Sequence, residues 1–143
     1  MNEPQQPQSL PSPFYRVTVK GLVFDERSRL LIIQNSNGNW ELPGGGWEHD
    51  ETFDECLKRE VYEELGVNVV SIGDLQFTYR RQSNSWGNLS LRLVVPVTLD
   101  SHDFRLESDM FATQFVDKSE FLELDMETAE GNIHDYVNRI WPE

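Results

Sequence analysis

A chain of 143 residues has the size of a single domain, and its 38% of hydrophobic residues is enough to build a core. The formal net charge of −13 argues against a long nucleic-acid partner, which would require a basic face. A small anionic substrate stays open, because bound cations can invert the local field. No apolar run is long enough to span a bilayer, so we expect no membrane partner. The single cysteine, Cys56, excludes an internal disulfide and fits a reducing cytoplasm, where we expect the protein to reside.

The first thirteen residues differ in composition from the rest of the chain. They hold four of the seven prolines within a polar run, and they contain neither a basic start nor an apolar segment. The segment is therefore not a signal peptide. We expect a flexible tail over residues 1–13 and a single domain over residues 14–143.

Strand-like and helix-like segments alternate in this domain. Strands are expected at residues 14–24, 29–34, 40–42, 67–72, 75–80, 89–99 and 115–116. Helices are expected at residues 52–65, 118–122 and 127–140. The first helix has Thr52 as N-cap, Glu55 closing a capping box and Gly66 as C-cap. In the last helix one apolar face should dock on the sheet, formed by Ile133, Tyr136, Val137 and Ile140. This order of elements predicts an α/β fold.

The first helix places carboxylates where an amphipathic helix would have apolar residues. Its apolar stripe consists of Phe53, Leu57, Val61 and Leu65. At about 100° per residue, Glu64 falls inside this stripe, Glu60 lies at its edge and Glu63 lies further round. A carboxylate that faces a core costs several kcal/mol without a partner, and three carboxylates at this spacing repel one another. A divalent cation such as Mg²⁺ would resolve both problems. The alternative interpretation is a solvated acidic face.

Three consecutive glycines, Gly44 to Gly46, follow Pro43 and precede the helix. We expect them to form a loop, because glycine allows positive φ and close approach of the backbone to a ligand. Such a loop before a helix N-terminus suits phosphate binding or metal-coordinating carbonyls. The alternative is a plain tight turn.

The glycines and the helix together follow a long spaced pattern. It reads Gly45, five residues, Glu51, seven residues, Arg59-Glu60-Val61, one residue, Glu63-Glu64, one residue and Gly66-Val67. The segment resembles the full signature of the Nudix hydrolases, the MutT-like family, and every fixed position is filled. The resemblance implies an α/β/α sandwich around a mixed β-sheet. It also implies hydrolysis of a nucleoside diphosphate linked to another moiety, with Mg²⁺ or Mn²⁺ as cofactor.

The same resemblance implies roles for individual residues. The metal ligands would be the backbone carbonyl of Gly45 and the carboxylates of Glu60, Glu63 and Glu64. Glu51 and Arg59 would form a supporting pair that orients the helix and its carboxylates. We therefore count Glu51, Arg59, Glu63 and Glu64 as the catalytic set.

The general base stays open at this point. It could be Glu63 or Glu64, or a carboxylate from a loop before a late edge strand. Glu107 and Asp109 occupy that loop and are candidates for an additional base or ligand, although solvated loop charges are the alternative.

Substrate contacts would come from strand cations and from aromatic residues near loops. The cations are Arg16, Lys20, Arg80, Arg81 and Arg92, and the aromatic residues are Phe14, Trp47, Tyr79 and Trp86. Arg80 and Arg81 point to opposite faces of a strand, so only one can reach a cleft. We select Arg16, Arg80, Trp47 and Tyr79. The three histidines lack ligand spacing and are expected at the surface: His49, His102 and His134.

The substrate within the family is predicted by elimination. The proline typical of ADP-ribose hydrolases is missing from Arg80 to Gln82, and the tyrosine typical of dinucleoside polyphosphate hydrolases is missing from Gln82 to Asn84. A nucleoside triphosphate or nucleotide sugar is therefore preferred. The alternatives are a non-catalytic Nudix-like nucleotide-binding module, which would be expected to lose a metal-binding glutamate, and an acidic interaction protein. Homodimers are common in the family, so a homodimer stays open.

Overall fold

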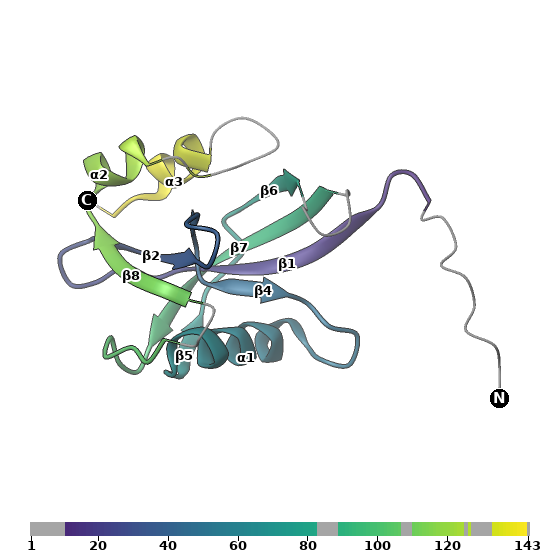
Figure 1. Ribbon diagram of the computed structural model, residues 1–143, viewed down its shortest axis with the longest axis horizontal. Coiled ribbons are helices and arrows are strands. Elements are labelled where there is room, and N and C mark those ends of the chain that lie inside the picture. Colours follow the sequence, from purple (N-terminus) through teal and green to yellow (C-terminus); the bar gives the residue numbers. More distant parts are fainter. Residues whose placement is uncertain (1–10, 83–88, 107–109, 125, 127–132, 143) are drawn as a thin grey trace.

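A computed structural model describes residues 11–82, 89–106, 110–124, 126 and 133–142. Two β-sheets form a central layer, and helices cover it on both sides (Figure 1). Helix α1 (Phe53–Leu65) lies on one side, and helices α2 (Lys118–Glu123) and α3 (Ile133–Ile140) lie on the other. This arrangement confirms the expected α/β/α sandwich. No helix within the described ranges is long and apolar enough to cross a membrane.

The larger sheet is mixed, as the resemblance implied. Its order is β4 (Gly44–Gly46), β1 (Tyr15–Leu22), β7 (Leu89–Leu99) and β5 (Val69–Ile72), and β6 (Phe77–Gln82) also pairs with β7. Strands β1 and β7 run parallel, and the other pairs are antiparallel. The smaller sheet is antiparallel and has the order β3 (Trp40–Glu41), β2 (Leu30–Asn35) and β8 (Met110–Val116).

Helix α1 begins and ends as its sequence predicts. The Thr52 side chain accepts a hydrogen bond from the Glu55 N–H, and the Glu55 side chain accepts one from the Thr52 N–H, which completes the capping box. Gly66 closes the helix in the left-handed conformation, with φ 68°. These local signals fix the register of the helix, and therefore fix which of its carboxylates face the sheet.

Two hydrophobic cores lie on the two sides of the central layer. The core under α1 is built from this helix and the sheet residues that face it, among them Val19, Leu57, Val61, Leu65, Val95 and Val97. The core under α2 and α3 includes Leu22, Leu30, Tyr79, Val94, Phe121, Ile133 and Val137. Alternation along β1 therefore sends Val19 towards α1, while Lys20 and Leu22 face the opposite side. Ile133 and Val137 are buried, which confirms the predicted docking face of α3.

The three glycines form a strand rather than the expected loop. Strand β4 pairs antiparallel with β1, and Gly44 lies opposite Lys20 while Gly46 lies opposite Thr18. Gly44 has φ 131°, and a Cβ there would overlap the carbonyl oxygen of Val19. Glycine is thus needed for the close pairing of two strands.

Other boundaries also differ from the expectation. Strand β8 begins at Met110, earlier than Phe115, because its pairing with β2 extends from Val116 back to Met110. Helix α2 matches the predicted turn. Helix α3 is described from Ile133, and the residues predicted to begin it, 127–132, lie outside the described residues, as do residues 1–10 of the predicted tail.

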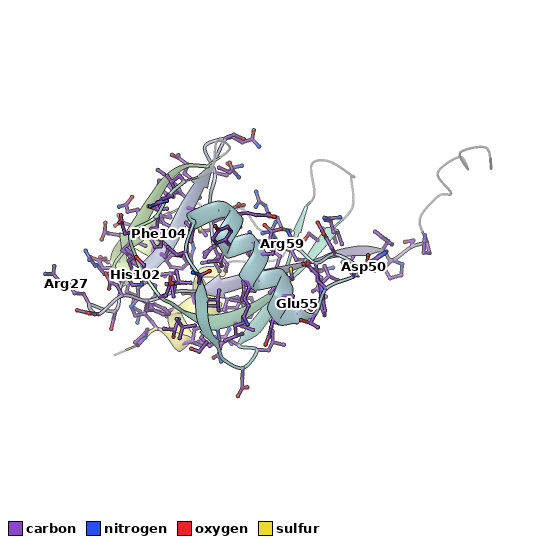
Figure 2. All side chains as sticks on the ribbon, turned by 90° about the horizontal axis from the view of Figure 1, so that it is seen from below. Arg27, Asp50, Glu55, Arg59, His102 and Phe104 are labelled. Carbon is purple, nitrogen blue, oxygen red and sulfur yellow. The ribbon has the colours of Figure 1, made fainter. Side chains whose placement is uncertain are left out.

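The prediction that all three histidines lie at the surface is wrong for His134. Its side chain is only 8% exposed and packs edge-on against Phe121, with ring centroids 5.0 Å apart. The reason is that α2 packs against α3 and buries a second face of that helix. His49 and His102 are exposed as expected, and His102 lies beside Phe104 (Figure 2).

Candidate active site

Glu64 faces inward from α1, as the helical wheel predicts. It is 6% exposed, and its Oε1 accepts a hydrogen bond of 3.0 Å from the Gly44 N–H. Its Oε2 is buried and has no hydrogen-bond partner among the residues that the structure describes. Burial raises the pKa of Glu64 to about 8, although the nearby Lys20 ammonium and the Gly44 N–H both act to lower it. An unsatisfied carboxylate oxygen in the interior is costly, so this position calls for a cationic or hydrogen-bonding partner.

Glu60 lies directly against β4. A Cβ at Gly45 would overlap the Glu60 carboxylate, so only glycine allows this approach of the helix side chain to the strand. Burial raises the pKa of Glu60, and the Arg59 guanidinium partly opposes this shift. Gly45 and Glu60, which the resemblance assigns to one metal site, are therefore in contact.

Arg59 connects the acidic residues of this region. Its Nε and Nη2 donate to the two carboxylate oxygens of Glu51 at 2.9 and 2.7 Å, and Nη2 also donates to the Gly46 carbonyl at 3.1 Å. Its Nη1 donates to Glu60 at 2.9 Å and to Glu63 at 3.3 Å. Such a two-point contact between guanidinium and carboxylate is strong and directional. Figure 2 shows Arg59 on α1, with Asp50 in the loop before the helix.

The Glu51–Arg59 contact shifts both groups towards their charged forms. Hydrogen bonds from Arg59 hold the pKa of Glu51 at about 2, and Glu51 raises the pKa of Arg59 further. The backbone N–H of Glu48 also donates to the Glu51 carboxylate, at 3.0 Å. The structure thus brings the predicted supporting pair together across the loop that joins β4 to α1.

The carboxylates of this region are not grouped as a metal-binding site in the described part of the chain. Within the described ranges, no three side chains of Asp, Glu, His or Cys are grouped closely enough to hold a metal ion. Nη1 of Arg59 donates to both Glu60 and Glu63, so these two carboxylates are bound to a cation of the chain itself. The donors nevertheless suit a hard cation: the unpartnered Oε2 of Glu64, the Glu60 carboxylate and the backbone of Gly45.

A lysine that the sequence offered as a phosphate contact instead supports β4 from the other side of the sheet. Lys20 is 2% exposed, and its ammonium donates to the carbonyls of Leu42 and Gly44 at 3.0 and 3.1 Å. The Gly44 peptide therefore links Lys20, through its carbonyl, to Glu64, through its N–H. Burial lowers the pKa of Lys20, while the Glu41 carboxylate 3.9 Å away raises it. Side chains alternate between the two faces of a strand, and this alternation along β1 is the sequence signal that could have predicted the inward orientation of Lys20.

The predicted substrate contacts are spread over several surfaces. The Arg16 guanidinium lies against Gly46, and Arg80 contacts the Tyr15 hydroxyl at 3.4 Å. Arg81 points to the opposite face of β6, as predicted, and donates to Glu41 at 3.0 Å. Arg80 and Arg81 therefore lie on opposite faces of β6.

Two of the aromatic candidates, Trp47 and Tyr79, pack within the fold, although Trp47 is still 37% exposed, and Phe14 is 39% exposed. Trp47 packs edge-on against Phe53, with centroids 5.6 Å apart, and its indole N–H donates to the Glu51 carbonyl. Tyr79 is 4% exposed within β6, so the prediction that it lies near a loop is wrong. Trp86 falls in residues 83–88, which lie outside the described residues. Glu107 and Asp109 also lie outside them.

Cys56 lies beneath β4. Its thiol is buried and contacts the Gly46 carbonyl at 3.6 Å, as the sequence predicts for a structural cysteine. Burial raises the pKa of this thiol to about 12, so it stays protonated at neutral pH.

Comparison with known proteins identifies the family. The family model described as NUDIX domain matches residues 14–136, and the chain therefore belongs to this family. A MutT-like protein from Streptomyces ambofaciens is 43% identical over 81 residues, which are 56% of this chain and 51% of that protein. An 8-oxo-dGTP diphosphatase from Proteus vulgaris is 37% identical over 54 residues, 34% of this chain and 48% of that protein. The chain thus spans about half the length of these two curated relatives.

A solved structure extends the similarity over nearly the whole fold. The crystal structure of a MutT protein from Methanosarcina mazei Go1 matches with a TM-score of 0.75 and 27% sequence identity. The match covers 92% of this chain and 95% of the other.

Proposed function

We propose that this protein hydrolyses the phosphoanhydride bond of a nucleoside diphosphate linked to another moiety, with Mg²⁺ or Mn²⁺ as cofactor. The observation that carries this proposal is Glu64, a buried carboxylate beside a glycine strand, with one oxygen that has no hydrogen-bond partner in the described part of the chain. Membership of the NUDIX domain family supports the reaction class. The preferred substrates are a nucleoside triphosphate or a nucleotide sugar.

The metal would be held by one face of α1 and by β4. The residues that would hold it are Gly45, Glu60, Glu63 and Glu64, through one backbone carbonyl and three carboxylates. When bound, the ion would neutralise the diphosphate and lower the pKa of a coordinated water. Glu60 and Glu63 would have to loosen their contacts with Arg59 to take part, and the longer contact, at 3.3 Å, is that of Glu63.

The chain's own residues hold this geometry. Arg59 ties the helix to Glu51 and to the Gly46 carbonyl, so it fixes α1 against the strand that carries Gly45. On the other side of β4, Lys20 fixes the Gly44 peptide, which in turn donates to Glu64. Both contacts orient the carboxylates before any ligand arrives, which is the preorganisation that such sites require.

A proton must be taken from the attacking water. Of the two described candidates, Glu63 is the more accessible, with a side chain 56% exposed, whereas Glu64 is buried and already accepts the Gly44 N–H. We therefore favour Glu63 over Glu64 as the base, with Glu107 and Asp109 as alternatives from the distant loop.

The test is a turnover screen with identified products. Purified protein with Mg²⁺, and then with Mn²⁺, is incubated with nucleoside triphosphates, nucleotide sugars, ADP-ribose, dinucleoside polyphosphates and capped RNA. We expect one class to be cleaved at a phosphoanhydride bond, and Glu63→Gln to lower the rate by orders of magnitude. The exposed Glu123 provides a matched control, because Glu123→Gln should retain the wild-type rate. Metal binding without turnover of any compound would instead support the nucleotide-binding module.

A further inference from the structure

The chain passes from the smaller sheet to the larger sheet between β3 and β4, and this short segment surrounds the ammonium of Lys20. Nζ of Lys20 donates to the carbonyls of Leu42 and Gly44, at 3.0 and 3.1 Å. The Glu41 carboxylate lies 3.9 Å from the same nitrogen. An ammonium has three N–H donors and no acceptor, so three acceptors from one short segment match its capacity. The segment from Glu41 to Gly44, which we call the crossing segment, is therefore folded around one buried cation.

The end of the crossing segment is held from both faces of the sheet. The Pro43 carbonyl accepts a hydrogen bond of 2.8 Å from the Gly21 N–H, which ties the segment to β1. The Gly44 carbonyl accepts from Lys20, whose side chain lies on the face away from α1. The Gly44 N–H donates to Glu64, whose side chain comes from α1 itself. Lys20 and Glu64 therefore hold one residue of β4 from opposite sides.

Stability alone does not account for a lysine at this position. The Lys20 side chain is buried, and burial lowers its pKa. The charges of Arg92 and Arg81 act in the same direction, whereas the charge of Glu41 opposes them. An apolar side chain of similar length could fill this volume without the desolvation of a charge, and such replacements of buried ions are often neutral or stabilising. What an apolar side chain could not supply is the direction of the two carbonyls that the ammonium binds.

The direction of the Gly44 backbone groups decides how Glu64 is held. Gly44 has φ 131°, a conformation that glycine adopts readily and other residues do not. Glycine also has the greatest backbone freedom, so its N–H keeps one direction only where other contacts restrain it. The hydrogen bond from Lys20 is such a restraint. Groups that orient a metal-binding carboxylate without touching the metal commonly change metal affinity or activity by about 10- to 100-fold when they are removed.

Glu41 keeps the ammonium against the crossing segment. Its Oε1 lies 3.9 Å from Nζ of Lys20, and its Oε2 accepts a hydrogen bond of 3.0 Å from Arg81 on β6. Burial acts to raise the pKa of Glu41, but the surrounding cations lower it below its ordinary value, so the carboxylate is ionised at neutral pH. At 3.9 Å the contact with Lys20 acts through charge rather than through a hydrogen bond. Loss of this negative charge would leave a buried ammonium near two arginines, which is strongly unfavourable.

We propose that Lys20 and Glu41 form a positioning pair for the candidate active site, which fixes the crossing segment so that the Gly44 N–H holds Glu64. Neither residue of the pair touches the metal or the substrate. Lys20 acts through Gly44, and Glu41 acts through Lys20. This inference rests on the proposed function, since it assigns residues that set the position of a metal-binding carboxylate.

The test compares Lys20→Met, Glu41→Gln and the double variant with the wild type. Lys118→Met is the matched control, because Lys118 is an exposed lysine on α2. Calorimetry measures the Mg²⁺ affinity, and the ¹H–¹⁵N NMR spectrum in EDTA reports on the Gly44 N–H. Thermal unfolding checks the fold, which Lys20→Met should retain because Glu41 keeps its contact with Arg81.

We expect Lys20→Met to weaken Mg²⁺ binding about tenfold and to shift the Gly44 amide signal upfield, with no change in the control. Loss of a nearby positive charge would by itself strengthen cation binding, so a weaker affinity points to position and not to charge. Because Glu41 acts through Lys20, the double variant should bind Mg²⁺ as Lys20→Met does. With the substrate that the turnover screen identifies, kcat of Lys20→Met should fall about tenfold while KM stays within about twofold.

Three results would overturn the inference. They are unchanged or tighter Mg²⁺ binding by Lys20→Met, losses that add in the double variant, and a raised KM with unchanged kcat, which would make Lys20 a substrate contact. The affinity and the amide signal are measured without turnover, so they are independent of the hydrolysis. Wild-type turnover with unchanged Mg²⁺ affinity in Lys20→Met would refute the positioning pair alone. Weakened Mg²⁺ binding in this variant without turnover by the wild type would refute the hydrolase alone.

Discussion

Glu64→Gln is expected to change how the stability of the metal-free protein depends on pH. In the unfolded chain, Glu64 releases its proton near its ordinary pKa of 4.5, whereas burial keeps it protonated in the folded state to about pH 8. Between these two values the folded state binds more protons than the unfolded state. The free energy of unfolding of the wild type should therefore fall as pH rises from about 4.5 to 8.

The size of this effect follows from the shift itself. One pKa unit corresponds to about 1.36 kcal/mol, so the shift to about 8 sets an upper limit of about 5 kcal/mol. The amide introduced by Glu64→Gln has no proton to release, so the variant should become more stable relative to the wild type as pH rises through this window. The amide oxygen can still accept the Gly44 N–H. The assay is urea unfolding in EDTA at a series of pH values.

The control for this series is Glu123→Gln, which changes an exposed glutamate on α2. Its unfolding free energy should run parallel to that of the wild type at every pH. If Glu64→Gln also ran parallel to the wild type, Glu64 would not be buried as a protonated acid, and the reasoning would be refuted. Saturating Mg²⁺ should reverse the order above pH 8, because a ligand that binds only the folded wild type stabilises it by mass action.

Two further substitutions test the geometry around β4. Gly45→Ala places a methyl group against the Glu60 carboxylate, so we expect calorimetry to show at least tenfold weaker Mg²⁺ binding. The control is Gly38→Ala, at a position with positive φ and open space around it. It should lower stability by about 1 kcal/mol and leave the Mg²⁺ affinity unchanged. Arg59→Lys removes the two-point contact with Glu51, so we expect at least a tenfold loss of kcat with the fold intact by circular dichroism; a wild-type kcat would argue against the supporting role.

Local signals were sufficient for α1 and for the orientation of its carboxylates. The capping box of Thr52 and Glu55 and the C-cap Gly66 lie within a few residues of the helix ends, so they can be recognised without tertiary information. Once the helix register is set, the wheel places Glu64 towards the core, Glu60 at the edge of the apolar stripe and Glu63 further round. The spacing of Arg59 and Glu51 in the family signature likewise predicted their contact.

The features that sequence reasoning missed depend on contacts between distant segments. Pairing of β4 with β1 converts an expected loop into a strand, and nothing within the three glycines specifies that partner. His134 is buried because α2 packs over it, which the pattern of α3 alone does not show. Alternation separated Arg80 from Arg81, but only the sheet pairing shows that Arg81 is the one that meets Glu41.

Hydrolysis in ¹⁸O-labelled water tests the central claim most directly. The wild type, Glu63→Gln and Glu123→Gln are incubated with Mg²⁺ and the substrate that the turnover screen identifies, and the products are weighed by mass spectrometry. The account predicts a single ¹⁸O atom on one phosphate-bearing product of the wild type and of Glu123→Gln, with formation slowed by orders of magnitude in Glu63→Gln. An ¹⁸O label bonded to carbon instead of phosphorus would contradict the account. Equal rates in all three proteins would contradict it as well.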